Sequence, residues 1–399
     1  MTSVTHVPLG DLMATKTGSV DPSKYQDEAF DLYSIPAFDR GAPEVAEGSA
    51  IGSAKQVVEP QDVLLSKIVP HIRRTWVVGD DRGRRLIASG EWIVFRSPRA
   101  EPSYLRQVLR SDPFHVQFMQ TVAGVGGSLL RARPTQVARI SIPLPPLPEQ
   151  RRIAAILDQA DALRAMRRES LAQLDSLAQS IYIEMFGDPR ENERGWSTAP
   201  IGSLVSDMRG GAALEPEDFI ESGFPVLHKG AIKPNGGLAF DPKKRPFTAS
   251  EYAEARPRSR IGRDFIAVTL RDLVPSGPSI GLATDLRFGP FDEYLLAQGA
   301  YGFRVDAARL TAAYVVALSN MPTFRYVLRQ NAVGSTQIHI RTPIYLAIQI
   351  PVPPISLQQT FAARIQAVEA LKTTHRAALT ELDTLFASLQ HRAFAGQLS

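Results

Sequence analysis

The chain repeats itself, and this repeat constrains the fold more than any other feature of its 399 residues. Two stretches, 95–186 and 303–394, match each other at one constant spacing of about 208 positions. The matching pairs include Gly126 and Gly334, Pro143 and Pro351, and Gln150 and Gln358. Roughly twenty identities without a gap over about 60 residues are hard to obtain by chance. The sequence therefore predicts a tandem duplication of one domain-sized unit.

Each copy contains a long segment with helical periodicity. In the first copy it follows the proline-rich motif Pro143–Gln150 and contains no Gly or Pro until Gly187. Its apolar residues step by three and four, which is typical of a coiled-coil seam. The second copy runs from Ser356 to near Phe394. At about 1.5 Å per residue, each segment would form a rod of roughly 55–60 Å.

We predict that the two long helices pair with each other as an antiparallel coiled coil. The alternative is that each helix packs on its own domain, as a single amphipathic helix ordinarily does. The residues expected to form the seam, and to dock partner proteins, are Ile153, Ile156, Leu163, Leu171, Leu174, Ile181, Leu371, Leu379, Leu382, Phe386 and Leu389.

The rest of each copy has the pattern of a mixed α+β domain. Short apolar runs such as Phe265–Leu270 alternate with turn-forming residues, and helical stretches are expected at Tyr104–Val122 and Ala307–Gln330. We predict two related globular α+β domains, separated and joined by the two long helices, in a pseudo-two-fold tandem repeat. The expected boundaries are 1–147 and 188–355 for the globular domains and 148–187 and 356–399 for the helices.

Composition and motifs exclude several classes of function. The chain has no cysteine, which excludes thiol chemistry and disulfides and suits a reducing cytoplasm. No apolar run approaches the roughly 18 residues of a membrane span. There is no P-loop, no G-x-S-x-G elbow and no His pair with metal-ligand spacing. Asp241 and Lys243 have nuclease D-x-K spacing, but no other acidic ligands lie nearby. We therefore expect no catalytic residue, and no metal or cofactor bound by this chain.

Basic residues cluster in the globular parts, although the net charge of +4 is modest. Charge runs usually form a solvated face, but two similar basic faces held at a set distance would suit two half-sites on DNA. The candidate DNA-binding residues are Lys67, His71, Arg73, Arg74, Arg131, Arg133, Lys229, Lys233, Lys243, Lys244, Arg245, Arg271, His339 and Arg341. Most would neutralise phosphates. Those expected to contact bases are Lys67, His71, Arg73 and Arg74 in the first domain and Lys229, Lys233 and Arg271 in the second.

The order of globular domain, proline motif and long helix, given twice, resembles the specificity subunit of type I restriction–modification enzymes. The stretch Ile140–Leu163, ISIPLPPLPEQRRIAAILDQADAL, and its degenerate copy Ile348–Leu371 carry the resemblance. Val7–Asp11 and Asp62–Ser66 are further features of it. The second copy departs from the pattern, because Ser356-Leu357 stand where Pro148-Glu149 stand in the first.

The resemblance implies that each globular part is a target recognition domain for one half of a split sequence in double-stranded DNA. The paired helices would set the gap between the halves and dock methyltransferase subunits, two of them, and restriction subunits where these are present. S-adenosylmethionine, ATP and Mg²⁺ would belong to those partners, and this chain would be a non-catalytic cytoplasmic subunit.

Two other classes of function stay open at this point. One is a coiled-coil adaptor that binds only proteins. The other is a stand-alone DNA endonuclease or methyltransferase, which would require a metal or cofactor cluster that the sequence does not show.

Overall fold

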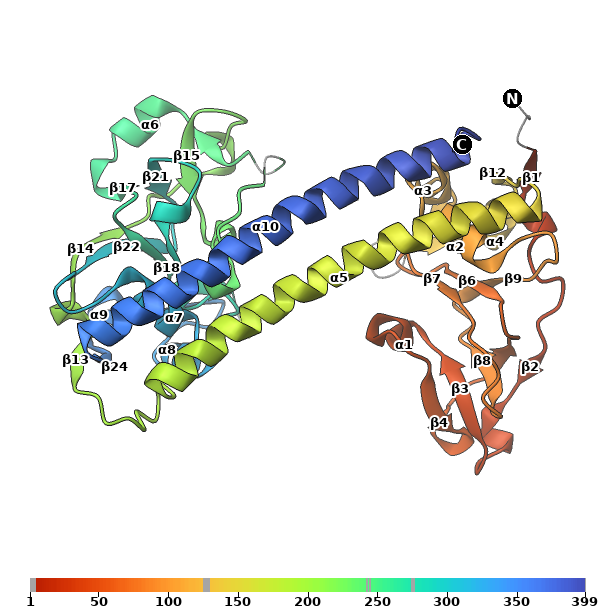
Figure 1. Ribbon diagram of the computed structural model, residues 1–399, viewed down its shortest axis with the longest axis horizontal. Helices are drawn as coiled ribbons and strands as arrows, with labels where there is room; N and C mark the ends of the chain where they lie inside the picture. The colour runs from red at the N-terminus through yellow and green to blue at the C-terminus, as the bar shows by residue number, and fades with distance from the viewer. Residues whose placement is uncertain (1–4, 125–129, 242, 244, 274–276, 399) are drawn as a thin grey trace. The chain divides into compact units, whose positions relative to one another are not determined.

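The computed structural model describes residues 5–124, 130–241, 243, 245–273 and 277–398. It divides into two compact units, which are coloured along the chain in Figure 1. Unit 1 comprises Met1–Arg167 with Ala378–Ser399, and unit 2 comprises Arg168–Ala377. Each unit contains sheets, short helices and one segment of each long helix, α5 (Leu147–Phe186) and α10 (Ile355–Phe394). The predicted α+β class is confirmed in both units.

Unit 1 has two main sheets. The first has the strand order β2-β5-β8-β3-β4, with β3 and β8 parallel, and the second is antiparallel with the order β7-β6-β9. The strands are β2 (Ser19–Val20), β3 (Ala29–Tyr33), β4 (Glu44–Glu47), β5 (Lys55–Val57), β6 (Val63–Ser66), β7 (Thr75–Val77), β8 (Arg85–Ala88) and β9 (Trp92–Phe95). The short helices are α1 (Ile35–Arg40), α2 (Pro102–Arg110), α3 (Asp112–Met119) and α4 (Pro134–Val137). Strands β6 and β9 are buried at every position, so both of their faces are packed.

Unit 2 has two four-stranded sheets, with the orders β14-β22-β18-β20 and β16-β15-β21-β17. The strands are β14 (Val205–Gly210), β15 (Phe224–Leu227), β16 (Phe247–Thr248), β17 (Arg260–Gly262), β18 (Ile266–Thr269), β20 (Ala283–Asp285), β21 (Glu293–Leu296) and β22 (Ala300–Val305). The short helices are α6 (Ser250–Glu254), α7 (Ala312–Asn320), α8 (Pro322–Gln330) and α9 (Thr342–Ala347). Strands β15 and β21 are parallel, and the other neighbours in these sheets are antiparallel.

The two units resemble each other most closely where the chain enters each long helix. In unit 1, β1 (His6–Pro8) pairs with β12 (Ser141–Pro143), and in unit 2, β13 (Thr198–Pro200) pairs with β24 (Gln349–Pro351). Each first strand leads into a glycine that packs closely on the backbone. A Cβ at Gly10 or Gly202 would lie 3.2 Å from a carbonyl oxygen, of Ala138 or Leu346 respectively. The two units therefore close their entry strands in the same way.

A buried glutamine in the first turn of each long helix fixes the proline motif. The Gln150 side chain donates to the carbonyl oxygens of Arg99 (2.9 Å) and Pro145 (2.7 Å) and accepts from the amide of Glu101 (2.8 Å). In unit 2, Gln358 makes the corresponding three bonds, to Arg309, Pro353 and Thr311, at 2.9, 2.8 and 2.9 Å. One amide thus satisfies three buried backbone groups in each unit.

A tyrosine of the preceding helix completes each anchor. Tyr104 donates to the carbonyl of Pro143 and Tyr314 to that of Pro351, both at 2.8 Å. Burial raises the pKa of both phenols well above the ordinary value, so both stay protonated donors. The ring of Tyr104 packs 6.1 Å from that of Phe394, and Tyr314 packs 4.9 Å from Phe186. The end of each long helix therefore rests on the anchoring tyrosine of the unit that it reaches.

The long helices pack together in antiparallel orientation, as predicted (Figure 1). In unit 1, Leu157 and Ala160 of α5 share a core with Phe386 and Ala393 of α10. In unit 2, the ring of Tyr182 lies 5.8 Å from that of Phe361. Early residues of α5 thus meet late residues of α10 in unit 1, and the reverse holds in unit 2.

Two of the predicted seam residues lie outside the seam. Leu163 is 42% exposed and Leu371, its repeat partner, is 52% exposed. Steps of four, three and four residues from Ile153 pass through Leu157 and Ala160 and reach position 164, not position 163. The equivalent steps on α10 reach position 372, not position 371. The expected frame was one residue out at this level, because it followed apolar residues, whereas the buried positions here are those of Arg164 and Lys372.

The seam positions at this level carry cations, each held by two carboxylates. Arg164 pairs with Asp161 at 2.8 Å and with Asp383 of α10 at 2.6 Å, and its guanidinium lies 4.2 Å from the Phe386 ring centre. We call these three charged residues the unit 1 triad. Its side chains bury a charge between the helices, since Arg164 is only 17% exposed.

The unit 2 triad consists of the corresponding residues. Lys372, 1% exposed, pairs with Glu369 at 2.6 Å and with Asp175 of α5 at 2.7 Å. Each triad therefore has a cation, an acid three residues earlier on the same helix and an Asp on the other helix. A polar layer of this kind fixes helix register, because a shifted alignment would leave a buried charge unpaired.

We predict that Gln150→Ala and Gln358→Ala each lower the free energy of unfolding by about 1–3 kcal/mol, because three buried backbone groups lose their partner. Chemical denaturation of the purified chain would measure the loss. Gln159→Ala, at an exposed position of α5, is the matched control and should leave stability unchanged. An equal effect at positions 159 and 150 would contradict the anchoring role.

For the unit 2 triad we predict that Asp175→Asn destabilises more than Lys372→Met. The first change leaves a buried ammonium with one partner, whereas the second removes the buried charge and leaves carboxylates that water reaches. The loss for Asp175→Asn should fall below the roughly 3–5 kcal/mol of a fully buried pair, because Asp175 is 42% exposed. Unfolding curves of both variants check the order, and the reverse order would contradict it.

Candidate nucleic-acid interface

In unit 1 the candidate site is a loop that joins two strands of the smaller sheet. The loop, Lys67–Arg74, connects β6 to β7 and carries four of the predicted DNA-binding residues. Its first residue is fixed by the backbone, because the Lys67 amide donates to Glu91 and its carbonyl accepts from Ala132. A β-bridge then joins Ile68 to Arg131 of β11 (Arg131–Ala132), which also pairs with β10 (Val122–Ala123). The structure thus brings Arg131 beside the loop.

Unit 2 has an equivalent arrangement. The amide of Leu270 donates to Gly299 and its carbonyl accepts from Ile340, which is the pattern of Lys67 in unit 1. Strand β19 (Arg271–Leu273) then pairs with β23 (Gln337–His339), with Arg271 opposite His339. Arg271 and His339 therefore occupy the positions that Ile68 and Arg131 occupy in unit 1. We call the two places the basic ribbons of unit 1 and unit 2.

Carboxylates hold several of these cations in place. Arg131 pairs with Glu91 at 3.1 Å and Arg73 with Asp112 at 2.5 Å. In unit 2, Lys229, in the short helical turn Lys229–Ala231, pairs with Asp272 at 3.0 Å. The structure therefore brings Lys229 to the basic ribbon of unit 2 from a distant part of the chain.

Asp272 is ionised in this arrangement. Burial, the largest influence, opposes ionisation, but hydrogen bonds from the Ser279 amide, Lys229 and the Leu273 amide outweigh it and lower the pKa of Asp272. The amides donate at 2.6 and 2.8 Å. The carboxylate therefore keeps its charge at neutral pH and fixes the ammonium of Lys229.

Arg74 has a different setting from the other residues of its loop. It is 8% exposed, and its guanidinium donates two hydrogen bonds to Asp39, at 2.7 and 2.8 Å. The hydrogen bond from Arg74 lowers the pKa of Asp39. The bidentate pair ties the loop to helix α1, which favours a structural role. The base-contacting role of Arg74 stays a prediction.

The remaining predicted residues fall into two groups. Arg133 and Arg341 are exposed at equivalent places, immediately before α4 and α9. Lys233, Lys243 and Arg245 are exposed in the segment between β15 and β16. Lys244 and Gly126 lie outside the described residues. His71 is exposed on its loop.

Sequence reasoning missed the acidic residues that position the cations. Asp272 adjoins Arg271 and could have been noticed there. Glu91 and Asp39 are 40 and 35 residues from their partners, so no local pattern indicates them. Tyr104 and Tyr314 were also missed, because their spacing is two residues longer than that of the rest of the repeat.

Within residues 5–124, 130–241, 243, 245–273 and 277–398, no group of three His, Asp or Glu side chains could hold a metal ion. Among the helices of the same ranges, none combines the length and apolar character that crossing a membrane requires.

Comparison with known proteins finds a family model and a similar protein that each match part of this chain. Residues 113–176 match the family model of the type I restriction modification DNA specificity domain. The type I restriction enzyme MjaVIII specificity subunit of Methanocaldococcus jannaschii is 23% identical over 244 residues. That match spans 58% of this chain and 56% of the relative, just over half of each.

Two solved structures share the fold over nearly the whole chain. A chain from a study of complex assembly and conformational transition of the type I R-M system aligns with a TM-score of 0.56 and 21% identity, covering 99% of this chain and 98% of its own. The type I restriction–modification system S subunit from M. genitalium aligns with a TM-score of 0.54 and 12% identity, covering 99% and 97%. The resemblance carried by the proline motif is therefore confirmed: this chain has the fold of type I specificity subunits, with a DNA specificity domain match at residues 113–176.

Proposed function

We propose that this chain is the DNA sequence-specificity subunit of a type I restriction–modification complex and that it recognises a bipartite target. The observation that carries the proposal is the recurrence of a basic ribbon at the same place in both units. Each ribbon follows a buried central strand, β6 or β18, and is closed by a strand from the segment before the proline motif. One unit would contact one half of a split DNA sequence, and the other unit the second half.

Affinity and specificity come from different contacts in this proposal. Exposed cations such as Arg133, Arg341 and Lys233 neutralise phosphates and give affinity that falls with salt. Lys67, Arg73 and Arg271 are the candidates for base contacts. The carboxylates Glu91, Asp112 and Asp272 orient neighbouring cations before DNA binds, and this lowers the entropy lost on binding.

Catalysis belongs to partner subunits in this proposal. Methyltransferase subunits, two of them, would supply S-adenosylmethionine chemistry, and restriction subunits, where present, would use ATP and Mg²⁺. Exposed leucines on the long helices support two equivalent docking points. Leu163 and Leu177 of α5 are exposed, and so are Leu371 and Leu385, their repeat partners on α10. Leucines exposed at equivalent places in the two repeats would give each docked subunit the same apolar contacts.

The same leucines also favour the second candidate function, an adaptor that binds only proteins. Failure to shift any DNA in the presence of the cognate methyltransferase would favour the adaptor. Cleavage of DNA by the purified chain with Mg²⁺ alone would instead favour a stand-alone nuclease.

We predict that Lys67→Ala relaxes base preference in one half of the target and that Arg271→Ala does so in the other half. Each loss should be about 1–3 kcal/mol on the preferred sequence. The complex with methyltransferase is titrated against DNAs altered in one half at a time, after methylated adenines have been mapped in a host that expresses both subunits. The control is Arg40→Ala, at the end of α1, where the Arg40 side chain pairs with Glu44 of β4. Equal weakening on all sequences would reassign the residue to phosphate contact.

We also predict that helix length sets the gap between half-sites. One heptad is inserted between Arg164 and Asp175, and a second between Lys372 and Asp383, which keeps both triads and the seam in frame. Seven residues add about 10 Å of helix, and this corresponds to about 3 base pairs at 3.4 Å per step.

Mapping methylated adenines would measure the new gap. Insertion into α5 alone is the control, and it should disrupt the seam and abolish specific methylation. An unchanged gap in the double insertion would contradict the proposed spacing role.

A further inference from the structure

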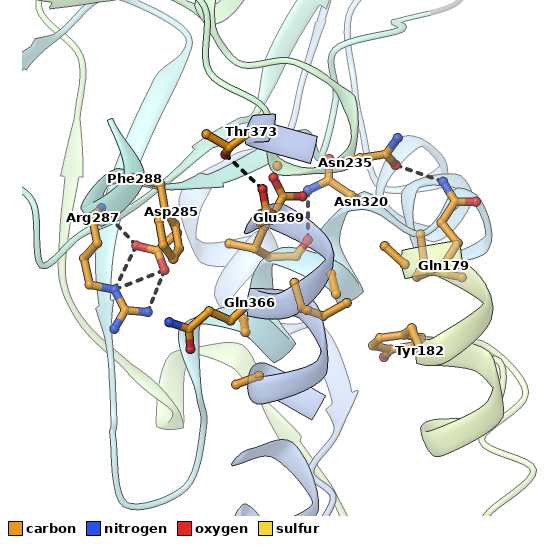
Figure 2. A pocket seen from close by; sticks show the side chains of 18 of the residues that line it. Gln179, Tyr182, Asn235, Asp285, Arg287, Phe288, Asn320, Gln366, Glu369 and Thr373 are labelled. Atoms are coloured by element: carbon orange, nitrogen blue, oxygen red, sulfur yellow. Dashed lines mark hydrogen bonds and ion pairs between the residues drawn. The ribbon is translucent and has the colours of Figure 1, made fainter. Parts of the chain in front are cut away.

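Unit 2 contains a cavity between its short helix α7 and the long helices. Its volume is about 580 Å³, and its walls come from α5, α10, α7 and the turns Pro234–Gly236 and Leu286–Phe288. Figure 2 shows Tyr182, Gln366, Glu369 and Asn320 around this space, with the bonded pair Asp285–Arg287 to one side. Ala317 and Ile365 are among the apolar residues of the lining.

In unit 1, ion pairs fill the equivalent interface between the short helix and the long helix. Arg106 and Gln107 of α2 donate to Asp158 of α5, at 2.7 and 2.6 Å. One turn further, Arg110 donates to Asp161 at 2.9 Å. Three long polar side chains therefore cross from the globular domain to the helix.

The anchoring tyrosines, Tyr104 and Tyr314, align helix α2 of unit 1 with helix α7 of unit 2 position by position. Because Tyr104 corresponds to Tyr314, Arg106, Gln107 and Arg110 correspond to Val316, Ala317 and Asn320 of α7. All three replacements are shorter, and all three line the cavity. On the helix pair, Ala178 lines the cavity at the position where unit 1 has the buried ring of Phe386. The cavity thus lies where unit 1 has two guanidinium groups, one carboxamide and one aromatic ring.

The wall of the cavity that α10 forms has hydrogen-bond acceptors at the same positions as in unit 1. Gln366 and Glu369 of α10 stand where Asp158 and Asp161 stand in unit 1. Glu369 contacts Lys372 at 2.6 Å, but its second oxygen lies 3.6 Å from Arg376, a long contact with a side chain that is itself exposed.

We propose that this cavity binds an alkylguanidinium ligand, which occupies the place that arginine side chains occupy in unit 1. The guanidinium donates to the carboxylate of Glu369 and to the side-chain oxygen of Gln366, and its aliphatic chain lies against Val316, Ala317 and Ile365. This site goes beyond the proposed recognition of DNA, since every residue named lies outside the basic ribbons.

The test measures binding of agmatine to the full-length chain by calorimetry. The matched ligand is carbamoylputrescine, which keeps the chain and the ammonium of agmatine but has a neutral urea in place of the guanidinium. We expect one agmatine site and at least about tenfold weaker binding of carbamoylputrescine, because charge-assisted hydrogen bonds are lost. The double variant V316R/N320R restores the unit 1 side chains, and we expect it to abolish binding and raise the melting temperature. Val333→Arg, at an exposed position, is the control and should bind agmatine as the parent does.

Three outcomes would overturn the proposal: no agmatine binding, equal binding of carbamoylputrescine, or full binding by V316R/N320R. Should circular dichroism show that the double variant is unfolded, Glu369→Gln replaces it. That variant removes the carboxylate that accepts from the guanidinium, and it must weaken agmatine binding at least about tenfold for the proposal to stand. DNA binding by the complex is measured on the same variants, so that failure of this site and failure of the DNA-recognition proposal are told apart.

Discussion

One buried amide in each unit determines where a long helix begins. Gln150 and Gln358 each bond two carbonyls and one backbone amide, and those backbone groups come from the proline motif and from the segment before α2 or α7. Without that bond set, the prolines would leave backbone groups unsatisfied in a buried place, because proline has no N–H to offer. The direction of each helix, and therefore its pairing, depends on this contact.

The sequence alone was sufficient for the repeat, the long helices and the α+β class, because each of these leaves a periodic or duplicated pattern. It was insufficient for the frame of the seam. Leu163 and Arg164 are adjacent, and a pattern of threes and fours accommodates either residue. The facing helix determines which of the two residues is buried, because Asp383 supplies the negative charge that allows Arg164 to be buried. Arg74 shows the same limit, because its partner Asp39 is distant in sequence and no local signal links them.

The two copies have diverged unevenly, and physical constraints explain where. Anchor residues and triads recur because each has several partners that would all be left unsatisfied. The sheets share no such constraint, so unit 1 has sheets of five and three strands and unit 2 has two of four strands. The interface between short and long helix has also diverged, from ion pairs in unit 1 to a cavity in unit 2. Functional differences between the units are therefore most readily accommodated there.

Asp161 has a role that Glu369 lacks. Its two oxygens bond Arg164 in the seam and Arg110 of α2, so one carboxylate links the globular part of unit 1 to the helix pair. In unit 2, Asn320 stands in place of Arg110, and the ion pairs of Glu369 with Lys372 and Arg376 lie within α10. The two ends of the spacer consequently differ in their response to ionic strength: ion pairs help to hold the first domain on its helices, whereas buried rings such as Tyr182 and Tyr314 hold the second. Added electrolyte would weaken the first attachment more than the second.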